Sequence, residues 1–140
     1  MDRGSYLLIL HLPEDSVIRT KGREFHLEKG FYVYVGSAMG GIGARIGRHM
    51  RREKKKHWHI DFLLERARIL EIVVIPSSVR LEEEISLAVS EYGRGVEGFG
   101  ATDTGTSSNL YHFREDPSDT VRALLREMGL RWYSITLRSD

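Results

Sequence analysis

A strand-like run that passes directly into a glycine-rich turn and then a helix constrains the fold of this chain most. Residues 31–35 are β-branched and aromatic, which is typical of a strand, and residues 36–41 form a turn rich in glycine. Residues 42–52 repeat an apolar side chain every four positions and therefore predict an amphipathic helix. We expect three of its side chains to face the core, namely Ile42, Ile46 and Met50.

The polar face of this helix carries cationic and titratable side chains. Arg45 and His49 are four residues apart, as are Arg48 and Arg52, so all four lie on one side of the helix. The planar guanidinium group of arginine binds two phosphate oxygens together, and histidine can carry a proton near neutral pH. The pattern is typical of a phosphate-binding site, and the alternative is a surface helix with scattered basic residues.

Basic residues continue beyond this helix. Those that we expect to bind nucleic acid are Arg48, Arg51, Arg52, Lys54, Lys55 and Lys56. The formal net charge of the whole chain is +1, so this concentration of positive charge is local. A basic segment is the usual electrostatic signature of a nucleic-acid partner, and the alternative is a solvated helix face.

Length and hydrophobic patterning predict one α+β domain over residues 1–140, with a mostly antiparallel central sheet flanked by helices. A chain of 140 residues is long enough to bury a core of its own. We expect strands at 5–12, 17–20, 24–27, 31–35, 69–75, 110–113 and 132–137. We expect helices at 42–52, 81–92 and 117–128, and a helix or a strand at 58–64.

Composition excludes several classes of site. The chain has no cysteine, which rules out disulfides, thiolate metal sites and a cysteine nucleophile. We find neither a signal peptide nor an apolar run of about 18 residues, the length that spans a bilayer. The sequence therefore predicts a cytoplasmic protein without a membrane partner.

Two triplets and the residues that follow them resemble the GIY-YIG nucleases. Gly4-Ser5-Tyr6 and Tyr34-Val35-Gly36 look like the two signature triplets of that superfamily. Arg45 and His49 look like the Arg-x-x-x-His pair of its first helix, and Glu84 looks like its single metal-binding glutamate. The chain is most similar to a compact archaeal and bacterial branch sometimes called DUF123, whose motifs are visible at 34–38, 48–49 and 57–61.

Two segments depart from the family pattern. Residues 7–33 separate the triplets, a longer spacing than in most of the superfamily, so we expect an added hairpin between them. The loop at 100–109 lacks the cysteine and histidine residues that the branch often carries, and Asn109 stands where a histidine is expected. Asn109 is therefore a candidate for the polar role that a late asparagine has in other members.

The resemblance implies a metal-dependent DNA endonuclease that hydrolyses phosphodiester bonds, with a role in DNA repair or processing and a repair protein as partner. The implied catalytic residues are Tyr6, Tyr34, Arg45, His49 and Glu84. Glu84 would bind Mg²⁺ or Mn²⁺, with its neighbours Glu82 and Glu83 as alternatives. Arg45 would neutralise charge that develops on the phosphate. A tyrosine hydroxyl would orient or deprotonate the attacking water, and His49 is the rival base.

The segment His57-Trp58-His59-Ile60-Asp61 is a second candidate site. In a strand, His57, His59 and Asp61 would share one face and offer ligands to zinc or manganese, whereas in a helix only His57 and Asp61 would pair. A purely structural role, with the polar side chains hydrogen-bonded, is the alternative. Two further functions therefore stay open: a non-catalytic nucleic-acid-binding module on the same fold, and a metallohydrolase built on these three residues.

Overall fold

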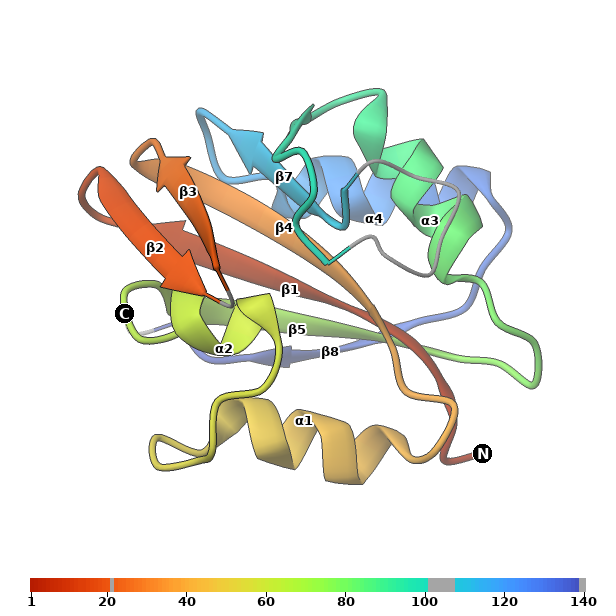
Figure 1. Cartoon of the computed structure of the whole chain (residues 1–140). Helices are drawn as coiled ribbons and strands as arrows, with labels where there is room; N and C mark the ends of the chain where they lie inside the picture. The colour runs from red at the N-terminus through yellow and green to blue at the C-terminus, as the bar shows by residue number, and fades with distance from the viewer. Residues whose placement is uncertain (21, 101–107, 139–140) are drawn as a thin grey trace.

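A six-stranded antiparallel sheet lies between two pairs of helices (Figure 1). The computed structural model describes residues 1–20, 22–100 and 108–138. The strands are β1 (Gly4–Leu12), β2 (Ser16–Thr20), β3 (Arg23–Leu27), β4 (Gly30–Ser37), β5 (Arg68–Pro76), β6 (Arg94–Gly95), β7 (Leu110–Phe113) and β8 (Tyr133–Thr136). The helices are α1 (Ile42–Met50), α2 (His59–Leu63), α3 (Glu82–Ser90) and α4 (Ser118–Glu127).

The strand β1 lies at the centre of the sheet, whose order is β6-β7-β4-β1-β5-β8. Successive side chains of a strand point to opposite faces. Leu8 and Leu10 of β1 pack in one core cluster with side chains from α1 and α2, while Leu7 and Ile9 pack in a second cluster with side chains from α3 and α4. Because both faces of β1 are covered, its sequence is a nearly continuous apolar run.

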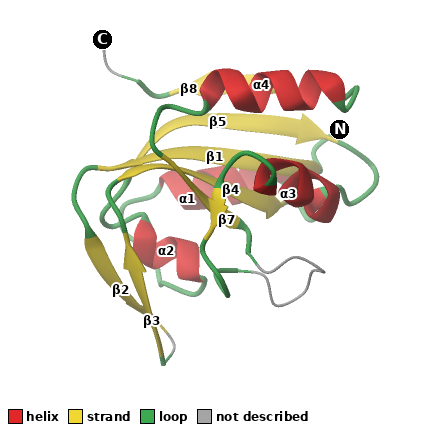
Figure 2. Ribbon diagram, turned by 90° about the horizontal axis from the view of Figure 1, so that it is seen from above, coloured by secondary structure: helices red, strands yellow, loops and turns green. Residues whose placement is uncertain are grey.

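The predicted fold class is confirmed, since the chain forms an α+β domain with an antiparallel sheet flanked by helices. The hairpin expected between the two triplets is present as a separate two-stranded sheet of β2 and β3, which lies beside α2 (Figure 2). The ambiguous segment at 58–64 contains the helix α2, and the short strand β6 was not expected. None of the helices in the described part of the chain is long and apolar enough to cross a lipid bilayer.

One predicted core position in α1 is wrong. Met50 is 47% exposed, and His49 is buried instead, next to Ile42 and Ile46. The reason is the pitch of the helix: positions 42, 46 and 49 line up after almost two turns, whereas position 50 lies about 100° further round. The imidazole ring of His49 is therefore the third buried side chain of α1.

The strand β7 is shorter than β4 and leaves the last residues of β4 without a strand partner on one side among the described residues. The strand β7 pairs with β4 from Phe113 opposite Phe31 to Leu110 opposite Tyr34. Val35 still donates its backbone N–H to the Asn109 carbonyl, but no described strand pairs with the last residues of β4 on this side. At this place the side chains of α1 and α3 reach a common space.

Candidate functional site

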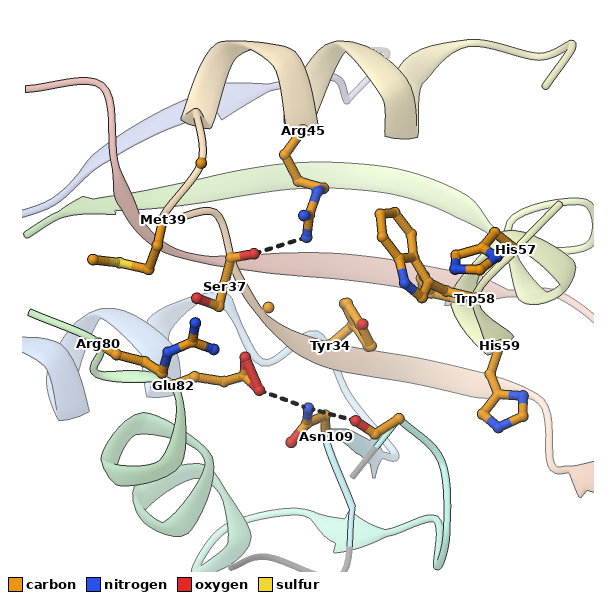
Figure 3. Close-up of a pocket in the computed structure, with 14 residues that line it drawn as sticks. Tyr34, Ser37, Met39, Arg45, His57, Trp58, His59, Arg80, Glu82 and Asn109 are labelled. Carbon is orange, nitrogen blue, oxygen red and sulfur yellow. Dashed lines mark hydrogen bonds between the residues drawn. The ribbon is translucent and has the colours of Figure 1, made fainter. Parts of the chain in front are cut away.

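A cavity of about 440 Å³ lies at this end of β4, between side chains of α1 and α3 (Figure 3). The residues that line it are Tyr34, Gly36, Ser37, Met39, Gly40, Arg45, His57, Trp58, His59, Ile60, Arg80, Glu82, Gly100 and Asn109. Cations, a carboxylate, a phenol and imidazoles therefore meet in one space, although they come from distant parts of the sequence.

The guanidinium group of Arg45 is held in place by two neighbours. Its Nη1 donates a hydrogen bond of 2.8 Å to the Ser37 carbonyl oxygen at the end of β4. Its Cζ lies 4.4 Å from the centroid of the Trp58 ring, and the Arg48 Cζ lies 4.2 Å from the same centroid. Stacking of guanidinium groups on an aromatic ring favours a fixed orientation. Arg45 thus points into the cavity as a rigid cation (Figure 3).

Asp61, the last residue of the motif at 57–61, forms an ion pair with Arg48, the second arginine on the Trp58 ring. The Asp61 carboxylate is fully buried and accepts two hydrogen bonds from Arg48, at 2.7 and 2.8 Å. Its Oδ2 also accepts the backbone N–H groups of His57 and Trp58, at 2.7 and 2.9 Å. Burial opposes ionisation of Asp61, but Arg48 and the two N–H groups outweigh it and hold its pKa at about 2.

A buried pair of Tyr6 and His49 lies behind Tyr34 and Trp58, and neither of the two side chains lines the cavity itself. The Tyr6 hydroxyl and the His49 Nε2 are 2.7 Å apart, and the two side chains are 1% and 3% exposed. Burial, together with the positive charge of Lys54, lowers the pKa of His49 to about 4. Burial also raises the pKa of Tyr6 to about 12, although Arg45 opposes this shift. At neutral pH the pair is therefore an uncharged phenol beside an uncharged imidazole.

Tyr34 lines the cavity directly, with its ring centroid 6.5 Å from that of Tyr6. The two tyrosines come from paired strands, in which Tyr6 is opposite Gly36 and Leu8 is opposite Tyr34. A Cβ atom on Gly36 would overlap the Tyr6 ring, which explains the glycine of the second triplet. Burial raises the pKa of Tyr34 well above 10, and nearby Tyr6 and Glu82 raise it further.

The carboxylate that lines the cavity belongs to Glu82 and not to Glu84. Glu82 is the first residue of α3 and is 9% exposed, whereas Glu84 is exposed and does not line the cavity. The predicted placement of Glu84 beside Arg45 is thus corrected. Two positions along a helix differ by about 200°, so only one of these glutamates can face the cavity.

Asn109 orients the Glu82 carboxylate. Its Nδ2 donates to Glu82 Oε1 at 3.2 Å and to the Gly100 carbonyl at 3.0 Å, and its side chain is 2% exposed. The Ser86 hydroxyl lies 3.4 Å from Asn109 Oδ1. The polar role predicted for Asn109 therefore corresponds to a contact with the acidic group. The neighbouring segment 102–105 lies outside the described residues.

The oxygen donors around Glu82 fit a hard divalent cation. The Ser37 hydroxyl lines the same cavity, and its buried Oγ has no hydrogen-bond partner in the described part of the chain. Mg²⁺ prefers oxygen ligands and retains several waters, so that one carboxylate with neutral oxygens nearby suits it. Zinc prefers nitrogen and sulfur ligands in larger sets. Among the described residues, no group of three His, Cys, Asp or Glu side chains could hold a metal ion.

The structure does not bring the second candidate site together. His57 and His59 line the cavity, but Asp61 is turned away into its ion pair with Arg48. The His59 Nδ1 lies 3.3 Å from the hydroxyl of Thr20 in β2. The added hairpin therefore braces this histidine and, through it, the start of α2.

Part of the basic run is used within the fold. Arg48 binds Asp61, Lys54 donates to the backbone carbonyls of Arg48 and His49 at the end of α1, and Lys56 pairs with Glu65. The remaining residues of the run have exposed side chains, and these are Arg51, Arg52 and Lys55.

Two polar residues of the cavity, Ser37 and Arg80, were not among the candidate site residues of the sequence. Arg80 is exposed and reaches the cavity from the segment before α3. Ser37 follows the second triplet directly and presents both its carbonyl and its hydroxyl. The position of Arg80, two residues before the acidic start of a helix, is a signal that could have marked it as a partner of the same site.

A family model described as "Domain of unknown function DUF123" matches residues 5–130 of the chain. The match extends from β1 to the loop after α4 and thus includes every residue that lines the cavity. No curated protein and no solved structure matches the chain at a significant level.

Proposed function

This chain belongs to the DUF123 family, and we propose that it is a metal-dependent endonuclease that hydrolyses phosphodiester bonds in DNA. One observation carries the proposal: the Arg45 guanidinium, the Glu82 carboxylate and the Tyr34 ring line a single cavity. The resemblance of the two triplets to those of the GIY-YIG nucleases supports the same function. We further propose that it acts in DNA repair or processing in the cytoplasm, together with a repair protein.

Arg45 would bind the phosphate at the bond that is cut. A guanidinium group has five N–H donors, so Arg45 can hold the Ser37 carbonyl and still donate to phosphate oxygens. Because Trp58 fixes its orientation, the positive charge needs little rearrangement as negative charge develops on the phosphate. Arg80, on the same cavity, would add a second positive charge.

Glu82 would hold Mg²⁺ or Mn²⁺, with the oxygens of Ser37 in the same cavity. A cation bound there supplies Lewis-acid stabilisation of the phosphate and of the leaving oxygen. Asn109 keeps the Glu82 carboxylate oriented through its amide hydrogen bond. The position of Glu82 at the first turn of α3 also stabilises its negative charge through the helix dipole.

Tyr6 and His49 would take up the proton of the attacking water. Tyr34 orients this water, and the water oxygen forms a bond to phosphorus while the bond to the leaving oxygen breaks. The leaving oxygen takes a proton from solvent water. The water proton passes to the Tyr6 oxygen as the Tyr6 hydroxyl proton passes to His49 Nε2, which accepts it in the neutral tautomer that carries its own proton on Nδ1. No phenolate forms in this transfer, in keeping with the raised pKa of Tyr6.

Metal-dependent nicking of supercoiled plasmid DNA tests the proposal. Glu82→Gln removes the charge but keeps the shape of the side chain, and we expect cleavage to fall by about 10²- to 10³-fold. Glu84→Gln is the matched control, because it makes the same change on the exposed side of the same helix. Equal effects of the two substitutions would contradict the assignment.

The same assay separates the alternative functions. DNA binding without cleavage in either metal would support a non-catalytic nucleic-acid-binding module. Cleavage that depends on His57 and His59 but not on Glu82 would support the metallohydrolase.

A further inference from the structure

The segment that joins α1 to α2 borders a second concave surface, a groove of about 920 Å³ near the end of β1 and the start of β5. We call it the basic groove. Its rim contains Arg51, Arg52, Arg66 and Arg68, and its floor contains Leu64, Ile69 and Leu137.

The rim of the basic groove carries positive charge that no carboxylate in the described chain neutralises. Its four arginines have exposed side chains and form no salt bridge with any described residue. Two carboxylates also line the groove, but Asp61 is paired with Arg48 and Glu65 is paired with Lys56. The groove therefore presents an excess of guanidinium groups, which bind phosphate oxygens in pairs.

The fold assembles this rim from two separate parts of the sequence. Arg51 and Arg52 follow α1, whereas Arg66 and Arg68 follow α2. The compact helix α2, with Asp61 anchored at its start, brings the second pair back beside the first. The linear run of basic residues thus accounts for half of the rim.

The apolar floor favours an unpaired strand over a duplex. Leu64, Ile69 and Leu137 are half-buried and leave an apolar surface between the arginines. A single strand can place its phosphates at such a rim and its sugars and bases on such a floor, whereas a duplex keeps its bases stacked inside. We propose that the basic groove binds a single-stranded segment of nucleic acid. The inference rests on the proposed function, in which this segment continues from the DNA held in the cavity.

Fluorescence anisotropy tests the inference with a labelled oligothymidylate and a duplex of the same length, in EDTA so that no cleavage occurs. We expect the double substitution Arg66→Ala/Arg68→Ala to weaken binding of the oligothymidylate by about tenfold. The slope of log affinity against log salt should become shallower by about 0.7 for each phosphate that the variant no longer neutralises. Binding of the duplex should change much less.

Matched variants keep the test decisive. Arg114→Ala/Arg131→Ala removes the same charge from exposed positions outside the groove and should leave the affinity for oligothymidylate within a small factor of wild type. Arg66→Lys/Arg68→Lys should retain most of the binding. Arg51→Ala/Arg52→Ala tests the opposite side of the rim if the first variant does not fold.

Unchanged affinity in both alanine pairs of the rim would overturn the inference, as would an equal loss for oligothymidylate and duplex. The nuclease proposal fails separately. If the protein binds oligothymidylate through the groove but cuts no DNA, the groove proposal is supported and the nuclease proposal is contradicted. If the protein cuts DNA but the rim variants bind oligothymidylate like the wild type, the nuclease proposal is supported and the groove proposal is contradicted.

Discussion

The cavity and the basic groove border the same short segment between α1 and α2, but they combine charge differently. In the cavity, Arg45 is fixed by Ser37 and Trp58 and shares the space with the Glu82 carboxylate. In the groove, exposed arginines surround an apolar floor. Positive charge is enough to hold a phosphate, whereas cutting it requires charges of both signs in fixed positions. Substitutions in the two regions should therefore differ in kind as well as in size.

Removal of the ion pair behind the cavity should cause the largest loss of stability. Arg48→Ala leaves the fully buried Asp61 carboxylate without its cation, so we expect the free energy of unfolding to fall by about 3–5 kcal/mol. Arg51→Ala, on the rim of the groove, should change it by about 0.5 kcal/mol or less. Urea denaturation measures both values. Similar effects would contradict the dependence of the buried Asp61 carboxylate on Arg48.

Arg45 and Arg66 should differ in what they contribute to cleavage. Arg45→Ala removes a fixed donor to the phosphate, and we expect kcat/KM to fall by about 10²- to 10³-fold, with most of the loss in kcat. Arg66→Ala should act through KM, because the groove binds the strand away from the bond that is cut. Steady-state cleavage of a labelled oligonucleotide separates the two effects. A loss confined to KM in Arg45→Ala would remove the distinction between cavity and groove.

The buried histidine next to the cavity should make stability depend on pH. The pKa of His49 is about 4 in the folded chain, against 6.5 for an exposed histidine. The unfolded chain therefore binds a proton between pH 6.5 and 4 while the folded chain does not. We expect the free energy of unfolding to fall by about 3 kcal/mol as pH falls through this range, and this contribution to be constant above pH 6.5.

Urea denaturation across this pH range checks the dependence. His49→Gln should flatten the profile, whereas His57→Gln, which changes an exposed histidine of the cavity, should leave its shape unchanged. A wild-type profile without a slope between pH 4 and 6.5 would contradict the buried neutral state of His49.

Most of the fold could be predicted from the sequence because its signals are local. The apolar run of β1 and the β-branched run of β4 mark strands by composition alone, and the long spacing between the triplets predicted the hairpin of β2 and β3. The segment at 58–64 was ambiguous because short apolar runs suit a helix or a strand equally. Its helical state depends on the Asp61 carboxylate, which accepts the N–H groups at the start of α2.

The site could be predicted only in part, because residue type and order do not fix the direction of a side chain. The two triplets and Arg45 pointed to the end of β4 at which the cavity lies. Glu82 and Glu84 are the same residue type in the first turn of α3. Only the orientation of the helix about its axis decides that Glu82 faces the cavity. Likewise, no local pattern places Arg66 on the same rim as Arg51, since that arrangement depends on the return of the chain after α2.

The smallest expected changes in stability come from alanine substitutions at two glycines. Gly36→Ala places a Cβ atom against the Tyr6 ring on the cavity side of the sheet, and we expect a loss of about 1–3 kcal/mol from overpacking. Gly47→Ala, on the exposed side of α1, meets no atom within 4 Å and should stabilise the protein by about 1 kcal/mol or less. Thermal unfolding measures both. If Gly36→Ala were neutral, Tyr6 would have room to move, and the rigid placement that separates the cavity from the groove would not hold.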